Sequence, residues 1–260
     1  MKAHILLEPD PALWPGRKVR AQSIIETFKA LGYEVLTYGP DEKDINHKII
    51  NPSDAENLET QLGILNGYHA VMNEHLMDAM SPQVTQGDLI VATEGWLDLG
   101  FRGLLEVERG KFKGATVIEY GIDYLDSFAP VRIFSSRHCL SSTSSDGKPR
   151  TNWIFSPMYI PVGEISLFEL PIYDEESHPF RLDHLYAAGR GVPTVAPDWG
   201  VWAETVANGY TGMLYRTPKG KIKAEEAAIK ISAQTVQASI TTRYNIKLAA
   251  AWCGNFIRGI

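Results

Sequence analysis

The residues best placed to do chemistry stand in the segment VPTVAPDWGVWAETV, where a short apolar run meets a turn and then a helix. The run ends near Ala196, and Asp198, Trp199, Gly200 and Val201 form the turn. In doubly wound α/β folds, ligands bind at the carboxyl ends of strands, beside helix N-termini. Free backbone N–H groups there can bind a phosphate, and glycine lets a diphosphate approach without a Cβ in the way. The plain alternative is a strand–turn–helix connection in which Asp198 caps the helix.

Charged side chains at other predicted strand ends form a second group of candidates. Glu94, Glu119 and Asp123 stand at or just after apolar runs, where their carboxylates can reach the ligand-binding edge of a sheet. Arg17 follows the first predicted strand, and its cation can neutralise a phosphate. The plain alternatives are a solvated surface charge for the arginine and helix capping or a surface pair for the carboxylates. Trp202 can stack on a flat ligand or simply pack in a core.

Several catalytic motifs are absent from the sequence. There is no GxGxxG after the first predicted strand, no GxxxxGK[ST] and no GxSxG, so dinucleotide, P-loop and serine-hydrolase chemistry have no support. There is also no HExxH, and Cys139 and Cys253 form neither a CxxC nor a zinc pattern. We therefore expect neither a metal nor a cofactor.

The elements that must position these residues follow an α/β pattern. Residues 3–8 are typical of a buried strand, residues 19–32 of a helix that ends at Gly32, and residues 33–39 of a second strand. A strand–helix–strand opening favours a parallel sheet. Short apolar runs suit further strands that are covered on both faces. Such runs stand at 69–73, 88–93, 115–121 and 131–136.

The second part of the chain carries a shorter α/β pattern, which follows a segment at 151–165 that we interpret as a crossing between domains. We predict a doubly wound, Rossmann-like domain at 1–155 and a shortened, Rossmann-like C-terminal lobe at 156–260. The elements predicted for this lobe are a helix at 180–191, a strand at 192–197, a helix at 201–209, a strand at 211–217, and two helices within 224–259 that are broken near Thr241–Thr242.

Length and composition bound the class of protein. The 260 residues, 44% of them hydrophobic, suffice for one large domain or two small ones. The formal net charge of −6 argues against binding nucleic acid by phosphate neutralisation. The two cysteines favour a reduced, cytoplasmic protein. No run reaches the roughly 18 apolar residues of a membrane span, and the N-terminal apolar run is too short for a signal peptide.

The segment HPFRLDHLYAAGRGVPTVAPDWGVWAETVANGYTGMLYRT resembles the donor-binding segment of the GT-B glycosyltransferases of the retaining, glycogen-synthase-like group, which is family 4-like. The pattern of this segment in the family is roughly EGFGxxxxEAxAxGxPVVAxxxGGxxExVxxGxTG. The spacing of the residues from Phe180 to Gly212 matches this pattern with at most a one-residue adjustment. Residues 118–139, 159–165 and 242–252 resemble other parts of the same family. The matching positions are Gly191, Pro193, Gly200, Glu204, Val206, Gly209, Thr211 and Gly212.

The resemblance implies a GT-B fold and metal-independent, retaining transfer of a sugar from a nucleotide-sugar, which is a co-substrate rather than a cofactor. In this family the first domain binds the acceptor and the second binds the donor. The catalytic candidates are then Glu119, His178 and Arg17, and the acceptor-binding candidates are Glu94 and Asp123. The donor-binding candidates are Gly16, Arg181, Tyr186, Arg190, Trp199, Gly200, Val201, Trp202 and Glu204.

Two departures from the family pattern matter. His178 and Tyr186 stand where the family has two glutamates spaced E-x7-E, and neither carries a carboxylate, although both can bond a hydroxyl. About a hundred family residues have no counterpart, because only residues 166–177 bridge the gap in which the family carries an Arg and a Lys that clamp the diphosphate. Arg17, Lys18, Arg181 and Arg190 are the candidates to replace that clamp.

Three functional hypotheses follow. The first is a compact glycosyltransferase with a nucleotide-sugar donor and an unidentified acceptor. The second is an inactive binding or scaffold protein that keeps the fold, because the two glutamates are missing. The third concerns the acceptor: compact members of such families occur in bacteriophages, where some glycosylate hydroxymethylated bases of viral DNA, although the net charge of −6 argues mildly against DNA.

Overall fold

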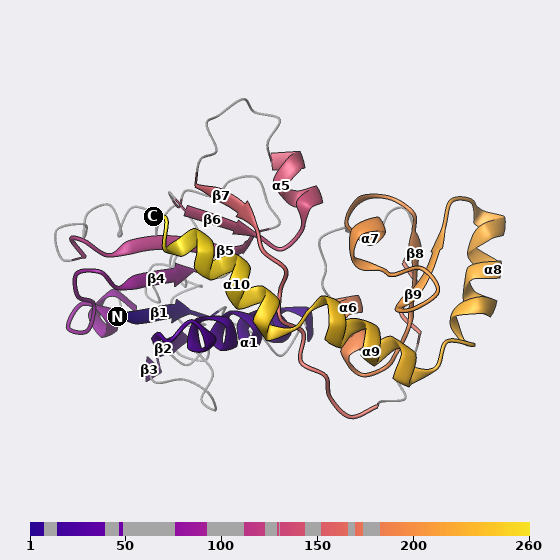
Figure 1. The fold of residues 1–260 in the computed structure, drawn as a ribbon, viewed down its shortest axis with the longest axis horizontal. Coiled ribbons are helices and arrows are strands. Elements are labelled where there is room, and N and C mark those ends of the chain that lie inside the picture. The colour runs from indigo at the N-terminus through magenta and orange to yellow at the C-terminus, as the bar shows by residue number, and fades with distance from the viewer. Residues whose placement is uncertain are drawn as a thin grey trace, which may run out of the picture.

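The computed structural model of the chain shows two α/β units side by side along the longest axis of the molecule (Figure 1). We call them the first unit, built around strands β1 to β7, and the second unit, built around β8 and β9. The described residues are 1–7, 15–39, 47–48, 76–92, 112–122, 129, 131–143, 152–165, 170–173 and 183–260.

The first unit contains a parallel sheet in the strand order β3-β2-β1-β4-β5-β6-β7. The strand order reverses between β1 and β4, which is the position where doubly wound folds bind their ligands. The strands are β1 (Lys2–Leu6), β2 (Glu34–Gly39), β3 (His47–Lys48), β4 (Leu89–Ala92), β5 (Thr116–Ile122), β6 (Val131–Phe134) and β7 (Trp153–Phe155).

The strands predicted at 3–8, 33–39, 88–93, 115–121 and 131–136 are confirmed as β1, β2, β4, β5 and β6. The strand predicted at 69–73 lies outside the described residues. The sequence does not predict β7, because the two prolines and the glycine of segment 151–165 favour a crossing between domains. In the structure, three residues of that segment first pair with β6, and the crossing begins after them.

The strand register places one residue of each strand in a single row across the sheet. Leu6, Ala92 and Glu119 are neighbours in this row, and β1 and β4 both end at it. The carboxyl ends of β1 and β4 therefore lie side by side, next to β5. The whole row is His47, Tyr38, Leu6, Ala92, Glu119, Arg132 and Trp153.

One face of the sheet is covered by α1 (Pro15–Ala30) and α10 (Ile246–Ile257), which contact each other. Phe28 of α1 and Cys253 of α10 are completely buried in the same cluster as Ile5, Tyr120 and Ile133 of the sheet. Helix α1 begins earlier than the predicted 19–32, because Pro15 suits the first helical position, and Gly32 follows it with φ +85° as the predicted C-terminal glycine.

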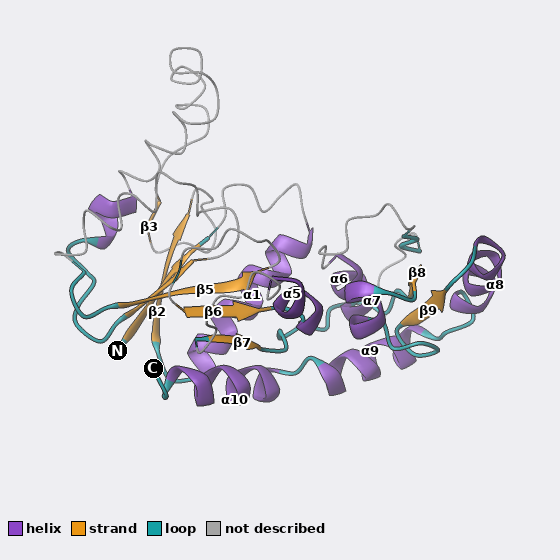
Figure 2. Cartoon of the chain, turned by 90° about the horizontal axis from the view of Figure 1, so that it is seen from above, coloured by secondary structure: helices purple, strands orange, loops and turns teal. Residues whose placement is uncertain are grey.

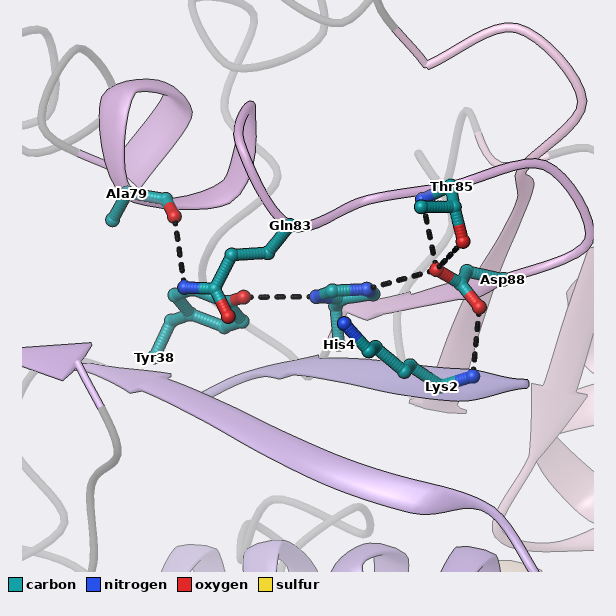
Figure 3. A network of polar contacts seen from close by, with 7 residues as sticks. All are labelled: Lys2, His4, Tyr38, Ala79, Gln83, Thr85 and Asp88. Atoms are coloured by element: carbon teal, nitrogen blue, oxygen red, sulfur yellow. Dashed lines mark hydrogen bonds and ion pairs between the residues drawn. The ribbon is translucent and has the colours of Figure 1, made fainter.

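A polar network lies on the opposite face of the sheet and links β1, β2 and the residue before β4 (Figure 3). The Tyr38 hydroxyl and His4 Nδ1 share a hydrogen bond of 2.8 Å, and His4 Nε2 lies 3.5 Å from Asp88 Oδ2. Asp88 also accepts from the backbone N–H of Lys2 at 2.7 Å and of Thr85 at 2.8 Å. Burial opposes ionisation of this carboxyl, but the hydrogen bonds outweigh it and lower the pKa of Asp88 to about 2. Burial lowers the pKa of His4, against the opposing effect of Asp88.

The second unit has a two-stranded parallel sheet, and Ile172 adds an isolated parallel bridge to Val195. The predicted helix at 180–191, strands at 192–197 and 211–217, and helix at 201–209 are all present, each shorter than predicted. The elements are α6 (Asp183–Gly189), β8 (Thr194–Pro197), α7 (Gly200–Thr205), β9 (Gly212–Tyr215), α8 (Pro218–Ala228) and α9 (Ala233–Arg243).

The helical region at 224–259 is divided differently from the prediction. It holds the end of α8, the whole of α9 and the whole of α10, instead of two helices. Helix α9 runs through Thr241–Thr242, and the break comes at Tyr244–Asn245. The break falls there because the Asn245 side chain accepts from Leu248 N–H and caps α10.

Helix α10 returns from the second unit to the first. Figure 2 shows α9 and α10 nearly in line along one side of the molecule, with the two chain ends close together. The predicted boundary between residues 155 and 156 coincides with the end of β7, whereas α10, from the predicted C-terminal lobe, packs on the first unit. The domain division stays a prediction. No helix among the described residues is long and apolar enough to cross a membrane.

Candidate functional site

The carboxyl edge of the large sheet faces the second unit. In Figure 1 the arrowheads of β1 and β6 point toward α6 and α7. Glu119 lies in the row where β1 and β4 end, and its side chain is completely buried. The acceptor-binding candidates Glu94 and Asp123 follow β4 and β5 but lie outside the described residues. The predicted carboxylates thus lie in β5 or follow the adjacent strands β4 and β5 in the sequence.

Gly16 and Arg17 lie in the first turn of α1. The helix predicted from residue 19 leaves both residues before its start, whereas α1 begins at Pro15. Helix α1 contacts α6, the helix that carries Tyr186. The fold therefore brings the element that carries Arg17 beside the element that carries Tyr186, although the two residues are 169 positions apart in the sequence.

Tyr186 and Arg190 form a cation–π pair on α6 and the turn after it. The Arg190 guanidinium carbon lies 3.6 Å from the centre of the Tyr186 ring. The Tyr186 ring also packs against the buried cluster of Met158 and Leu185, between α6 and the crossing segment. Two predicted donor-binding residues are thus adjacent, and each is already in contact with protein groups. His178 and Arg181 lie outside the described residues.

Among the described residues, two backbone donors at the start of α7 have no acceptor. Trp199 is the N-cap residue, in extended conformation and with no side-chain cap. Asp198 does not cap the helix; its carboxylate accepts from Arg216 Nε at 2.6 Å, and its N–H donates to Tyr215 O at 2.7 Å. Within the part of the chain that the structure describes, the N–H groups of Gly200 and Val201 have no acceptor. These two donors stand at the carboxyl edge of β8, as the sequence predicts.

The two tryptophans of this turn differ in exposure. Trp199 is 40% exposed, whereas Trp202 is completely buried. The Trp202 ring stacks on Tyr173 at 4.4 Å and meets the edge of His184 at 5.0 Å. Trp202 therefore has the core-packing environment considered for it from the sequence, and Trp199 has the accessible ring. The side chain of Val201 is also buried, so only its backbone could meet a ligand.

Sequence reasoning missed His184 and Thr205, which hold α6 against α7. Thr205 Oγ1 donates to Val201 O at 2.7 Å, so it accepts from His184 Nε2, also at 2.7 Å. The shared bond fixes the proton of a neutral His184 on Nε2. No motif marks the pair, because its two members are 21 positions apart and meet only in the folded chain.

Glu204 is engaged with the first unit. Its two carboxylate oxygens accept from the backbone N–H groups of Arg137 and His138, at 2.9 and 3.1 Å. Gly200, one helical turn earlier, faces the same helix: a Cβ at this position would lie 3.5 Å from His138 Nε2. The contact between these two residues and His138 joins the units beside the unpaired amides of α7.

Comparison with known proteins gives the fold class. The sequence matches no protein-family model, and no curated protein matches it significantly. Solved structures match across the whole chain. HepE from Anabaena in complex with UDP-glucose matches with a TM-score of 0.55 and 11% sequence identity, and the match covers 100% of both chains. The complex of HepE with UDP and glucose matches with a TM-score of 0.59 and 10% identity, and it also covers 100% of both chains.

Two further structures agree. AviGT4, a glycosyltransferase involved in avilamycin A biosynthesis, has a TM-score of 0.56 at 11% identity, over 100% of this chain and 99% of its own. A glycosyltransferase from Rickettsia africae has a TM-score of 0.54 at 9% identity, over 99% of this chain and 98% of its own. At these identities the likeness is one of fold, and the predicted GT-B-like α/β fold class is confirmed.

Proposed function

We propose that the protein is a glycosyltransferase that moves a sugar from a nucleotide-sugar to an acceptor. The observation that carries this proposal is the whole-chain likeness to HepE, whose structures were determined with UDP-glucose and with UDP and glucose. The sequence resemblance from Phe180 to Gly212 also supports it, because α6 and α7 of that segment contact α1 and α5 of the first unit.

The proposed donor site lies where α7 begins. The diphosphate would accept hydrogen bonds from the backbone N–H groups of Gly200 and Val201. The exposed ring of Trp199 would cover the sugar or the base. Arg17, in the first turn of α1, would supply the positive charge that a departing diphosphate needs. Tyr186 would offer its hydroxyl to the ribose after release from Arg190.

The proposed reaction needs no metal and retains the configuration at the anomeric carbon, as in the family that the sequence resembles. The bond between the anomeric carbon and the diphosphate oxygen breaks, and the acceptor oxygen forms the new bond on the same face. The acceptor proton passes to the departing phosphate. His178 would orient the donor sugar around this exchange, and Glu119 would orient the acceptor once its buried carboxylate is exposed.

Calorimetry with UDP, GDP, ADP and dTDP, each free and as a sugar nucleotide, tests the proposal. We expect one nucleoside diphosphate to bind and to raise the unfolding temperature in proportion to the logarithm of its concentration. An Arg17→Ala variant should bind it more weakly, and a Lys230→Ala variant, which removes an exposed charge from the end of the second unit, should bind it unchanged. Flat titrations with all eight ligands would contradict the proposal.

A second candidate function is nucleotide-sugar binding without transfer. The contact between the Tyr186 ring and Arg190 favours this candidate. Tyr186 stands in place of a glutamate that commonly holds the ribose, and its ring is already engaged by Arg190. Mass spectrometry of the bound donor after prolonged incubation separates the two functions. Hydrolysis or transfer supports the enzyme, whereas a donor that stays bound and intact supports the binding protein.

A further inference from the structure

The N-terminus of α5 (Arg137–Thr143) is completed by a side chain from the second unit. Ser136 precedes this helix, and its Oγ accepts from Cys139 N–H at 3.0 Å. The N–H groups of Arg137 and His138 donate to the two carboxylate oxygens of Glu204, at 2.9 and 3.1 Å. Each of the first three N–H groups of α5 therefore has an acceptor, and Glu204 of α7 provides two of the three.

Glu204 is also held from the opposite direction. Arg243 of α9 donates from Nη2 to the Glu204 carbonyl at 2.8 Å and from Nη1 to the Thr205 carbonyl at 3.3 Å. Helix α9 leads within two residues to α10, which packs on α1 of the first unit. The short helix α7 is thus fixed between α5 and α9, and Glu204 makes contacts toward both.

The electrostatics favour this arrangement. A carboxylate beside the N-terminus of a helix meets the positive end of the helix dipole, and hydrogen bonds to a charged acceptor are stronger than neutral ones. Gly200 lies on the same side of α7 as Glu204 and faces the His138 ring, where a Cβ would make an ordinary contact with Nε2 at 3.5 Å. The surface of α7 that contacts α5 therefore includes one carboxylate and one residue without a side chain.

We propose that Glu204 is a positioning residue: its carboxylate docks α5 of the first unit on α7 of the second, sets the separation of the two units and holds His138 at the start of α7. The docking is independent of any ligand. Its consequence for the donor rests on the proposed function, because His138 would then lie beside the amides that bind the diphosphate. Each carboxylate oxygen of Glu204 accepts from a backbone donor, so the docking role requires no contact of this residue with the donor substrate.

Hydrogen–deuterium exchange without nucleotide tests the docking directly. In Glu204→Ala, the amides of Arg137 and His138 should exchange at least about tenfold faster than in the wild type, since both lose their acceptor. Glu204→Gln offers one oxygen in place of two, so it should protect one of the two amides. The matched control is Glu226→Ala, which removes an exposed carboxylate from α8 and should leave α5 unchanged. Unchanged exchange of α5 in Glu204→Ala would overturn the proposal.

The separation of the units is measured by electron–electron resonance between spin labels on Gln86→Cys and Lys230→Cys, which are exposed on the first and second unit. The native cysteines Cys139 and Cys253 are buried, so labelling is selective for the new sites. The Glu204→Ala distance distribution should broaden relative to wild type and to the Glu226→Ala control. Identical distance distributions for wild type and Glu204→Ala would show that the contact is purely local and would overturn the proposal. If Glu204→Ala fails to fold, the same comparison is made with Glu204→Gln.

Titration with UDP links the docking to the donor. If wild-type protein binds UDP, Glu204→Ala should bind it at least about fivefold more weakly, because a smaller fraction of molecules has the competent arrangement. Equal affinity would remove the claim that docking serves the donor site. If wild-type protein binds none of the nucleotides, the proposed function fails, while the exchange and distance measurements still decide the role of Glu204.

Discussion

Gly191, Gly200 and Gly209 all adopt left-handed backbone conformations in the second unit, with φ of +80°, +59° and +82°. Their surroundings differ. A Cβ at Gly191 would lie 2.7 Å from the Cβ of Ala233 in α9, one at Gly200 would make an ordinary contact with His138, and one at Gly209 would have nothing within 4 Å. The glycines of the donor-segment pattern therefore serve the packing of α9 and the shape of turns, in addition to any approach of a ligand.

A three-member alanine series separates these effects. Gly209→Ala should cost about 1 kcal/mol of unfolding free energy, since alanine is strained in a left-handed conformation. Gly200→Ala should cost the same, whereas Gly191→Ala should cost roughly 1–3 kcal/mol more, because the new methyl group overlaps Ala233. Urea unfolding of the three variants measures the differences. Equal losses at all three positions would show that the packing against α9 is irrelevant to Gly191.

At the scale of elements, the network of His4, Tyr38 and Asp88 joins β1, β2 and the start of β4, and it makes the sheet sensitive to acid. Burial lowers the pKa of His4 below its usual 6.5. Just below pH 6.5 the unfolded chain therefore binds a proton at His4 that the folded chain does not bind. Stability from this group is present above pH 6.5 and is lost as the pH falls below it. Asp88 contributes about 2 kcal/mol above pH 3.8, which is lost as the pH falls toward about 2.

Urea unfolding at pH 7.5, 6.0 and 5.0 should show this dependence. Between pH 6.5 and 5.0 the wild type should lose stability with a slope of up to about 1.4 kcal/mol per pH unit from His4. His4→Gln should be less stable at pH 7.5, because it breaks the contacts with Tyr38 and Asp88, but its stability should fall less steeply. Parallel slopes for the two proteins would assign the acid sensitivity to other groups.

Helix boundaries belong to the same scale. Asn245 caps α10, so Asn245→Ala should lower the unfolding free energy by about 1 kcal/mol in a urea titration. Asn255→Ala, an exposed change within the same helix, is the matched control and should be nearly neutral. A loss as large in the control as at Asn245 would argue that the cap does not set this boundary.

The sequence predicts most strands because parallel strands are apolar throughout and short, whereas the break between α9 and α10 depends on one side-chain bond from Asn245. It also identifies the turn at Trp199–Val201, since glycine and the adjoining strand mark a carboxyl edge. It does not predict the partners of Glu204 or the contact between His184 and Thr205. Those residues meet across 66 and 21 positions, and no local pattern encodes such distances.

At the scale of the whole molecule, the described residues join the two units in several places: by the crossing segment after β7, by α1 on α6, by α5 on α7, and by α9 leading into α10. The crossing segment is itself fixed to the first unit, since Tyr159 N–H donates to Ser23 Oγ of α1 at 2.8 Å. It is tied to the second unit as well, because Gly163 N–H donates to Gly189 O at 3.0 Å. An arrangement with several short links restricts the units to a small range of relative positions.

The return of α10 makes the stability of the first unit depend on the last helix of the chain. Ala249 and Cys253 are completely buried, and Cys253 packs among the residues of β1, β4 and β5. Burial raises the pKa of the Cys253 thiol to about 12, so this thiol stays neutral and behaves as an apolar group. Removal of residues 246–260 should therefore expose the part of this sheet face that α10 covers and abolish a single cooperative unfolding transition.

Calorimetry and binding of a hydrophobic dye measure that outcome. The shortened chain should bind the dye strongly and lose the sharp heat-absorption peak, whereas a chain that lacks only residues 259–260, which are exposed, should behave as the wild type. Cys253→Ser gives a graded version, since burying a hydroxyl in place of the thiol should cost about 1–3 kcal/mol. If the chain without 246–260 unfolds with the wild-type midpoint, α10 is only an attachment of the second unit, and the sheet does not need it as a cover.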